Sequence, residues 1–480
     1  MSKIFKVVLV LVLLGANNSF CNVVDNVKDP NSIKECKTEK KSKLIISADD
    51  SRIKIHGAKF TKMVNGEMIM HRHTDKMYEG STNILRFNPE KAKSSTGISI
   101  RFKTKSPSVK VNLRISEEVL KKKPASSDIG IFQELNSISI PYHSSPVKPI
   151  TPNDKYRITY EIGKAFTINV VSENVGSLVE YKITLPIFID INLVGLELES
   201  GYDLVDYTEE IKPVYVAYGN SITHGRAQNA TYETYPYLIS EWMNWELYNI
   251  AVGGGKTSKY MAEMIRDKFT HIDYMTVLIG YNDYAGGGES TKTYTANYTE
   301  FLDIARDKHP NTIIYCLTLT ATTTTTSPES DVKAEEFRQV VRDVVKARQK
   351  AGDNKIFLIE GEDISSIADL KKKVHFTVEG ALRVADKLYL EINKTLSTET
   401  INNKKVEVNI YPNPATDTLM IDCKSNIEYV RIYDLSGKKV MDINLKKNNE
   451  SIDISKLKAG TYLLSATSDY KTSTISFIKK

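Results

Sequence analysis

A strand followed by a helix recurs five times between about Lys212 and Leu396, and this rhythm limits the fold of the chain more than any other feature. The strands are continuous apolar runs separated by amphipathic stretches. Strands that are apolar along their whole length form parallel sheets with helices on both faces. We therefore expect a three-layer α/β domain over residues 208–396. The expected strands are 214–218, 246–252, 275–280, 312–317 and 355–359, and the expected helices lie near 235–243, 258–268, 294–308, 331–351 and 378–396.

The regions on either side of this domain alternate apolar with polar residues. In residues 44–207 the alternation occurs in short runs that turn residues separate. This pattern predicts an antiparallel, jelly-roll-like β-sandwich, with no helix among its strands. Residues 406–480 show the same alternation and predict a small all-β sandwich. Examples of the runs are 97–104, 108–115, 156–162 and 181–185.

The N-terminal residues have the pattern of a secretory signal peptide. Lys3 and Lys6 precede the apolar run 7–14, which is too short to span a bilayer as a helix. We expect a signal peptide over 1–21 and no transmembrane span. A lipid-modified Cys21 is the alternative, but Ser-Phe precedes it instead of the usual small residues. The polar stretches 22–43 and 397–405 are predicted to be linkers.

Charge and cysteine content exclude further classes of protein. The 480 residues contain 65 Lys and Arg against 59 Asp and Glu, a formal net charge of +6. Eight lysines and four acidic residues place +4 of this charge in residues 1–43, which disfavours a basic surface for nucleic acid. The four cysteines lie far apart and predict neither a disulfide framework nor a zinc site. We interpret His71 and His73 as a solvated face of a strand, and expect no metal or cofactor.

Small and polar residues follow each of the first three parallel strands. Ser221 comes directly after the first strand, residues 253–255 are three glycines after the second, and Asn282 follows the third. The carboxyl ends of parallel strands meet at one edge of the sheet, where ligands bind. A serine there can act as a nucleophile, and glycine N–H groups with an asparagine amide can stabilise an oxyanion. Taken alone, Ser221 could equally be a helix N-cap.

Four histidines in the α/β region are candidates for the base that activates Ser221. His271 and His309 precede the third and fourth strands, so they belong to the opposite edge of the sheet. His224 lies three residues after Ser221 in the same turn, and we expect it to line the site. His375 follows the fifth strand and belongs to the correct edge. We therefore predict His375 as the general base.

Four blocks of this region resemble those of the SGNH, or GDSL-type, esterase superfamily. The resemblance implies Ser221 as nucleophile and His375 as base. It also implies an oxyanion hole formed by the N–H groups of Ser221 and Gly254 and the amide of Asn282. The blocks are Gly219-Asn-Ser-Ile, Gly254, Gly280-Tyr-Asn-Asp and Val374-His375.

The outer regions carry resemblances of their own. The predicted sandwich is similar to the N-terminal domain that precedes this hydrolase in some bacterial esterases, carbohydrate deacetylases among them. Its cues are 97–102 and 201–204. Residues 406–480 resemble a type IX secretion sorting domain, which implies export to the cell surface or beyond. The motifs are 411–415, 432–437 and 460–462.

Two positions depart from the superfamily pattern. Asn220 stands where an aspartate is usual, which changes turn hydrogen bonding. Lys372, three residues before the histidine, occupies the position of the superfamily's acid. A lysine there lowers the pKa of the histidine instead of stabilising its cation. A Ser–His dyad oriented by a backbone carbonyl is one expectation, and the candidate replacement acids are Asp369, Asp363 and Glu379.

The sequence thus predicts a secreted serine esterase that removes O-acetyl groups from polysaccharide without a cofactor. Its partners would be the acylated carbohydrate and the type IX secretion machinery, with no nucleic acid. Tyr281 and Tyr284 are expected to line the substrate site, and the threonine-rich loop 318–327 is a further candidate. A lipase or thioesterase on the same scaffold is one alternative. A surface carbohydrate-binding protein with an impaired hydrolase is another, because of Lys372.

Overall fold

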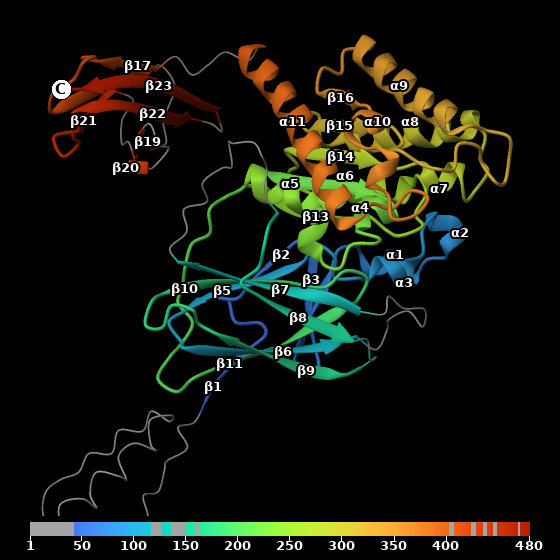
Figure 1. The fold of residues 1–480 in the computed structure, drawn as a ribbon, viewed down its shortest axis with the longest axis horizontal. Coiled ribbons are helices and arrows are strands. Elements are labelled where there is room, and N and C mark those ends of the chain that lie inside the picture. The colour runs from blue at the N-terminus through green and yellow to red at the C-terminus, as the bar shows by residue number, and fades with distance from the viewer. Residues whose placement is uncertain are drawn as a thin grey trace, which may run out of the picture. The chain divides into compact units, whose positions relative to one another are not determined.

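The structure of the protein is a computed structural model that describes residues 43–116, 126–135, 149–159, 161, 163–402, 408–423, 429–434, 439–444, 449–468 and 471–480. The predicted signal peptide, residues 22–42 of the first predicted linker and residues 403–407 lie outside these ranges. Three regions of regular structure follow one another along the described chain, coloured in Figure 1 from blue through yellow to red.

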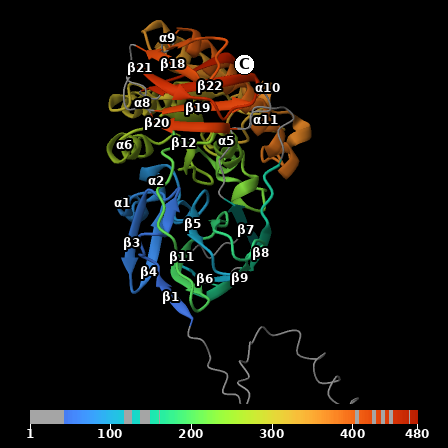
Figure 2. The same ribbon diagram turned by 90° about the vertical axis from the view of Figure 1, so that its left-hand side faces the viewer.

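The first region is a β-sandwich, as the alternating pattern predicts. Its strands are β1 Leu44–Ser47, β2 Lys54–His56, β3 Phe60–Val64, β4 Glu67–His71, β5 Ser99–Thr104, β6 Ser108–Ile115, β7 Ser126–Leu135, β8 Asp154–Thr159, β9 Ala165–Val171, β10 Val179–Thr184 and β11 Ile191–Leu198. One antiparallel sheet has the order β3-β4-β11-β6-β9, with β1 paired to β11, and the other has the order β2-β5-β10-β7-β8 (Figure 1, Figure 2). In β6 every second side chain is buried between the sheets, which is why period-two alternation marked it.

Three short helices interrupt the strands of this region, although none was expected there. They are α1 Asp75–Glu79, α2 Thr82–Leu85 and α3 Pro89–Ala92. Their apolar residues pack against the α/β region: Met77, Leu85, Phe87 and Ala92 belong to its hydrophobic core instead of the sandwich core. Helices of four or five residues are too short to show a helical period, so the sequence pattern could not reveal them.

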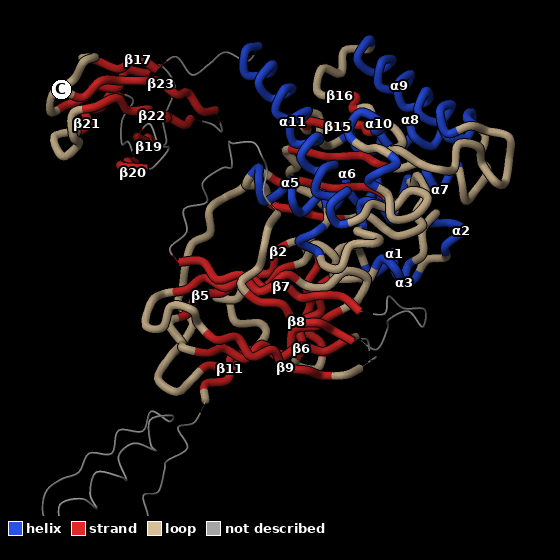
Figure 3. The backbone as a smooth tube through the Cα atoms, in the orientation of Figure 1, coloured by secondary structure: helices blue, strands red, loops and turns tan. Residues whose placement is uncertain are grey.

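The second region is a parallel sheet between helices, as predicted. Its strands are β12 Val214–Gly219, β13 Glu246–Asn249, β14 Tyr274–Leu278, β15 Ile313–Leu317 and β16 Ile356–Ile359. Its helices are α4 Ser221–His224, α5 Tyr235–Met243, α6 Lys259–Lys268, α7 Tyr281–Tyr284, α8 Thr291–Asp307, α9 Ala334–Lys350, α10 Gly361–Ile364 and α11 Val378–Asn402. Figure 3 shows these helices in blue around the red strands.

The central strand β12 is buried on both faces, which explains its unbroken apolar sequence. Val216 and Tyr218 belong to the core that α6, α8 and α9 cover. Tyr215 and Ala217, the alternate residues, belong to the core that α5 and α11 cover. All four side chains are at most 2% exposed. A polar residue in β12 would therefore be buried without water on either side.

The order of the parallel strands, β13-β12-β14-β15-β16, places a change of direction at β12. The chain goes from β12 outward to β13 on one side and then returns to β14 on the other. A crevice forms where neighbouring connections leave a sheet in opposite directions, and ligands bind there at the carboxyl ends of the strands. The residues after β12, β13 and β14 are those that the sequence marks as the site.

The third region is a small all-β module, as predicted. Its strands are β17 Val408–Tyr411, β18 Thr418–Cys423, β19 Tyr429–Asp434, β20 Lys439–Asn444, β21 Asn449–Asp453, β22 Gly460–Ser468 and β23 Lys471–Lys479. They form the sheets β17-β18-β21 and β20-β19-β22-β23, with apolar residues such as Leu419, Ile432 and Phe477 fully buried.

The helix before this module is longer than expected. α11 continues to Asn402, through residues 397–402 of the predicted linker, because polar residues can prolong a helix whose preceding turns are anchored by Leu388 and Ile392. Among the described residues, no helix is both long and apolar enough to cross a membrane.

Candidate active site

The structure brings Ser221 and His375 together, although 154 residues separate them in sequence. Ser221 Oγ lies 2.8 Å from His375 Nε2, a hydrogen-bonding distance. Both side chains are half-buried and therefore reachable from solvent. Ser221 is the first residue of α4, and the side chain of Asn220 accepts the N–H of Ile222 at 3.0 Å to cap this helix. Asn220 thus makes the turn contact expected of an aspartate, and Ser221 is left free for chemistry.

The predicted oxyanion donors lie in the two loops beside Ser221. Gly254 is exposed with a φ of 81°, a left-handed conformation that favours glycine. Among the described residues, no acceptor takes the N–H of Ser221 or of Gly254. Asn282 donates one amide hydrogen to the carbonyl of Gly255 at 2.9 Å, which leaves its second amide hydrogen for a ligand. The three predicted donors thus have hydrogens that no described acceptor takes.

His224 lies against the glycine loop 253–255, in a position that differs from the substrate-lining one expected from the sequence. Its side chain is fully buried. Nδ1 accepts the N–H of Gly253 at 2.9 Å, so Nε2 carries the ring proton and donates to Ser94 Oγ at 2.6 Å. Burial, with Arg72 nearby, holds the pKa of His224 well below its usual value. A neutral imidazole thus connects the sandwich region to the glycine loop.

Arg72 supports the same loop from the sandwich side. Its guanidinium is 1% exposed and donates to the carbonyls of Asn249 at 2.6 Å and Ala251 at 2.9 Å. It also donates to the hydroxyl of Ser94 at 3.0 Å. Burial lowers the pKa of Arg72 to about 10, so the cation persists at neutral pH. Sequence reasoning missed Arg72, because two of its partners, Asn249 and Ala251, lie more than 170 positions away in the α/β region.

Asp283 anchors the loop of Asn282 to residues 75–92 of the first region, which contain α1, α2 and α3 and which we call the helical insert. Its carboxylate is fully buried and accepts from the guanidinium of Arg86 at 2.9 Å and from the N–H of Thr257 at 3.0 Å. Burial and the nearby Glu289 raise the pKa of Asp283 to about 6 against the opposing effect of Arg86. The acid of the Gly-Tyr-Asn-Asp block is therefore a structural group here.

A hairpin at the carboxyl edge of the sheet presents His375. The N–H of Lys371 donates to the carbonyl of His375 at 2.8 Å, beside a bridge between Leu370 and Phe376. The side chain of Gln228 donates to the carbonyl of Phe376 at 3.0 Å. These bonds fix the backbone on both sides of the imidazole.

The threonine-rich loop packs against the tip of this hairpin. The N–H of Thr323 and the hydroxyl of Thr322 both donate to the carbonyl of Lys373 at 3.0 Å. Tyr284, which is fully buried, donates to the carbonyl of Thr324 at 3.0 Å, and the half-buried Tyr281 reaches the hydroxyl of Thr324 at 3.3 Å. Of the two tyrosines predicted to line the site, Tyr281 is thus the more accessible.

The surroundings of His375 contain cations and no paired carboxylate. Burial, followed by Arg226 and Lys372, lowers the pKa of His375 to about 4. Among the residues the structure describes, no carboxylate forms a hydrogen bond or ion pair with this imidazole.

Within the described residues, none of the three candidate acids forms a hydrogen bond or ion pair with His375. Asp369 accepts from Ser366 at 2.9 Å and from Arg383 at 2.6 Å. Asp363 and Glu379 are exposed. In the described structure, Ser221 and His375 thus form a hydrogen-bonded pair that no carboxylate joins.

His71 and His73 are buried, so their interpretation as a solvated face was wrong. His71 is 7% exposed and His73 is fully buried against the carbonyls of Ala92 and Ile250. The reason is the helical insert, which covers this end of β4. A search of the described residues finds no group of three or more metal-ligating side chains.

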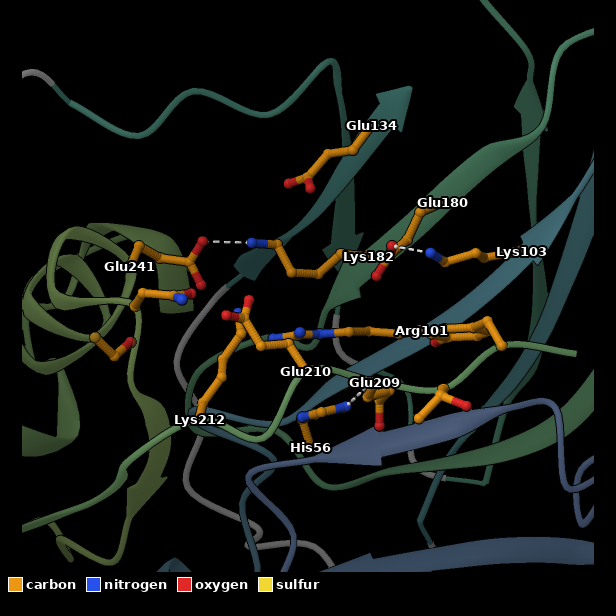
Figure 4. A pocket seen from close by; sticks show the side chains of 14 residues that line it. His56, Arg101, Lys103, Glu134, Glu180, Lys182, Glu209, Glu210, Lys212 and Glu241 are labelled. Carbon is orange, nitrogen blue, oxygen red and sulfur yellow. Dashed lines mark hydrogen bonds and ion pairs between the residues drawn. The ribbon is translucent and has the colours of Figure 1, made fainter. Parts of the chain in front are cut away.

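A separate polar cavity of about 230 Å³ lies where the sandwich meets α5. None of the predicted site residues lines it. Figure 4 shows its facing charges: Lys182 Nζ lies 2.5 Å from Glu241 Oε2, and His56 Nε2 lies 2.6 Å from Glu209 Oε1. The cavity is bounded by ion pairs that join the two regions.

Solved structures share the combined architecture of the first two regions. The Salicylyl-Acyltransferase SsfX3 from a tetracycline biosynthetic pathway has a TM-score of 0.61 at 18% identity, over 73% of this chain and 97% of its own. A structure described as a GDSL-like lipase from Bacteroides ovatus has 0.59 at 17% identity, over 74% and 98%. A family two carbohydrate esterase from Cellvibrio japonicus has 0.52 at 14% identity, over 74% and 98%. A search of curated proteins finds no match.

Two family comparisons agree with the fold. Residues 217–382 match the GDSL-like Lipase/Acylhydrolase family, and they span the loops of Ser221, Gly254, Asn282 and His375. Residues 409–480 match the Secretion system C-terminal sorting domain, which marks the chain for type IX export to the cell surface or outside. The resemblances expected from the sequence are thereby confirmed. Residues 217–382 form a GDSL-like acylhydrolase domain, and a secretion sorting domain follows it at the C-terminus.

Proposed function

We propose that this protein is a serine esterase that removes O-acetyl groups from polysaccharide outside the cell. The observation that carries the proposal is the 2.8 Å contact between Ser221 Oγ and His375 Nε2 at the switch point of the parallel sheet. The carbohydrate substrate is supported by the fold shared with a structure named as a carbohydrate esterase, at 14% identity. The extracellular site of action follows from the sorting domain.

In the proposed reaction, Ser221 attacks the ester carbonyl while His375 Nε2 takes the proton of the hydroxyl. The oxyanion of the tetrahedral intermediate accepts from the N–H groups of Ser221 and Gly254 and from Asn282. Each such donor contributes about 3 kcal/mol in analogous sites. The protonated His375 then gives its proton to the leaving sugar oxygen, and the acyl group stays on Ser221. Water, deprotonated by His375, releases acetate and restores the serine.

The Ser–His dyad makes a slower enzyme than a complete triad would. Nε2 of His375 accepts from Ser221 only when Nδ1 carries the ring proton, and no described residue accepts that proton. Loss of the orienting carboxylate costs on the order of 10⁴ in rate in a serine protease, where the wrong tautomer becomes populated. Here the hydrogen-bonded hairpin holds the backbone of His375 in place. We therefore expect measurable turnover at a reduced rate.

The direct test is acetate release from acetylated polysaccharides by the wild type and by Ser221→Ala. We expect the substitution to abolish release, because no other described nucleophile contacts His375. Thermal unfolding of both proteins controls for folding. Acetate release that persists in the variant would overturn the assignment of Ser221.

The absence of a carboxylate at His375 also favours a second candidate, a carbohydrate-binding protein with an impaired hydrolase. A fluorophosphonate probe separates the two, because it labels an activated serine and not an inert one. Labelling of the wild type, absent in Ser221→Ala and in His375→Ala, supports the esterase. An unlabelled wild type beside a labelled control enzyme supports the impaired protein. A series of 4-nitrophenyl esters of rising acyl length separates an acetylesterase from a lipase or thioesterase.

A further inference from the structure

Three cationic side chains come from separate segments that carry or adjoin the predicted site residues. Lys91, on α3, places Nζ at 3.6 Å from the point where a Cβ on Gly254 would lie. The N–H of Arg226 donates to the carbonyl of Ser221 at 2.8 Å, so this residue belongs to the nucleophile's own turn. Lys372 lies in the hairpin that presents the histidine. All three side chains are exposed, and we call them the cationic rim.

The backbone of the rim is held in place. The guanidinium of Arg226 lies 5.9 Å from the centre of the Phe188 ring, whose other neighbour is His224 at 4.3 Å between ring centres. The residue after Lys372 accepts two hydrogen bonds from the threonine-rich loop. Lys91 belongs to a helix that the side chain of Asn88 caps at 3.0 Å. The three charges therefore stand on ordered supports.

None of the rim residues has a carboxylate partner within the part of the chain that the structure describes. The other two exposed arginines there are both paired: Arg157 with Asp128, and Arg383 with Asp369 at 2.6 Å. Arg226 is the exception. Unpaired cations that lie near one another create a positive potential and attract an anion.

We propose that the cationic rim binds an anionic sugar unit, a uronate, so that the preferred substrate is an acetylated acidic polysaccharide. This inference rests on the proposed esterase function and narrows its substrate. A uronate carboxylate matches the planar guanidinium of Arg226 and the ammonium groups of the two lysines. A neutral polysaccharide would leave the three cations unmatched.

A bound uronate would also act on the dyad. The free site lacks a negative charge near His375, and Arg226 and Lys372 disfavour its protonated form. A substrate carboxylate between these two cations offsets their field and stabilises the imidazolium that forms during acylation. We therefore expect the anionic substrate to have a higher kcat as well as a lower KM. It supplies part of the charge that the acid provides in a complete triad.

The test compares acetate release from O-acetylated polygalacturonate with release from the same polymer after methyl esterification of its carboxyl groups. The two substrates share sugar, linkage and acetyl groups and differ in charge. We expect kcat/KM to be at least about tenfold higher for the charged polymer at low salt. The preference should shrink at high salt, because ions screen exposed charges.

The double variant Arg226→Gln, Lys372→Gln tests the rim itself. Its preference for the charged polymer should fall to about two- to threefold. In the wild type, but not in the double variant, the charged polymer should move the acid limb of the kcat profile to higher pH. Lys346→Gln, an exposed and unpaired lysine on α9, is the matched control and should keep the wild-type preference.

The outcomes separate the two proposals. Acetate release that depends on Ser221 but is equal for both polymers would overturn the rim and leave the esterase intact. A preference that survives in the double variant would also overturn the rim. Release from neither polymer, together with an unlabelled Ser221, would overturn the esterase and the rim with it.

Discussion

The hydroxyl of Ser94 lies 2.6 Å from Nε2 of His224, and the opposite nitrogen of that ring accepts the N–H of Gly253. The imidazole of His224 thereby bridges a residue of the sandwich region and the loop that carries Gly254. The loop of the proposed oxyanion hole is thus supported by a residue of the sandwich region.

Ser94→Ala should damage both stability and activity. It leaves the ring N–H of His224 buried without an acceptor, which costs about 1–3 kcal/mol. The loop after β13 loses its fixed support, so kcat should fall with little change in KM. Urea unfolding and 4-nitrophenyl acetate hydrolysis measure the two effects. Ser47→Ala, in an exposed serine, is the control. Unchanged kcat in a destabilised Ser94→Ala would show that the loop keeps its geometry without this contact.

The pH dependence of hydrolysis reports on His375. The proposed base must be neutral to act, and its pKa is lowered to about 4, first by burial and then by Arg226 and Lys372. Above this value the imidazole is deprotonated, so kcat/KM for a neutral ester should be level from pH 7 to about pH 5 and fall below that. A midpoint near 6.5 would contradict the described surroundings of this histidine.

Lys372→Asp should move the acid limb to higher pH by about one pH unit or more. The change removes a cation and adds a carboxylate near the imidazole, and both raise the pKa of His375. The carboxylate also stabilises the imidazolium, so kcat at pH 7 should rise severalfold or more. Lys346→Asp on α9 is the control for added negative charge. If both variants behave alike, a carboxylate three residues before His375 does not support catalysis in this fold.

Phe87→Ala should destabilise the α/β region, although the residue precedes that region in sequence. Phe87 is 2% exposed and belongs to the core that α6, α8 and α9 cover. Truncation of a buried phenylalanine costs about 3–5 kcal/mol. Unfolding in urea, followed by tryptophan fluorescence from Trp242 and Trp245, should shift to lower denaturant. Phe60→Ala, in a partly buried residue at the same core, should cost less.

His56→Gln should lower stability most under mildly acidic conditions. Burial lowers the pKa of His56, but hydrogen bonds to Glu209 and Glu246 outweigh it and raise the pKa above 6.5. The protonated ring therefore stabilises the folded state, fully below about pH 6.5, and this stabilisation is lost as the pH rises through the folded value. The loss in unfolding free energy should be about 1–3 kcal/mol at pH 6 and smaller at pH 9.

The control for His56→Gln is His271→Gln. His271 lies 2.8 Å from Asp273, but its side chain is 65% exposed, so its ion pair is screened by water. We expect little change at either pH. A His56→Gln variant equally destabilised at pH 6 and pH 9 would show that the charge of this ring does not hold the regions together.

The sequence predicted the sheet and the placement of its loops well. Long apolar strands and amphipathic helices can be predicted from their own residues. Because the carboxyl ends of parallel strands meet at one edge of the sheet, the loops of Ser221, Gly254, Asn282 and His375 are then expected at that edge. The rule also excluded His271 and His309 correctly, since they precede β14 and β15.

Features that depend on distant contacts escaped prediction. His224 looked like a site residue, but Ser94, 130 positions earlier, buries it. Arg72 and Arg86 meet partners in loops more than 170 positions away. Short helices such as α2 have no detectable period and form because the neighbouring core receives Leu85. Local sequence patterns do not predict such contacts between distant residues.

The helical insert has a consequence for how this protein can evolve. Met77 and Phe87 belong to the core that α6, α8 and α9 cover, so recombination that exchanged the sandwich alone would leave a void in that core. The smallest portable gene segment is therefore the pair of regions, from β1 to α11. Substitutions in the core that the sandwich and α/β regions share should therefore occur together in both regions. The sorting module has its own core and can be exchanged independently.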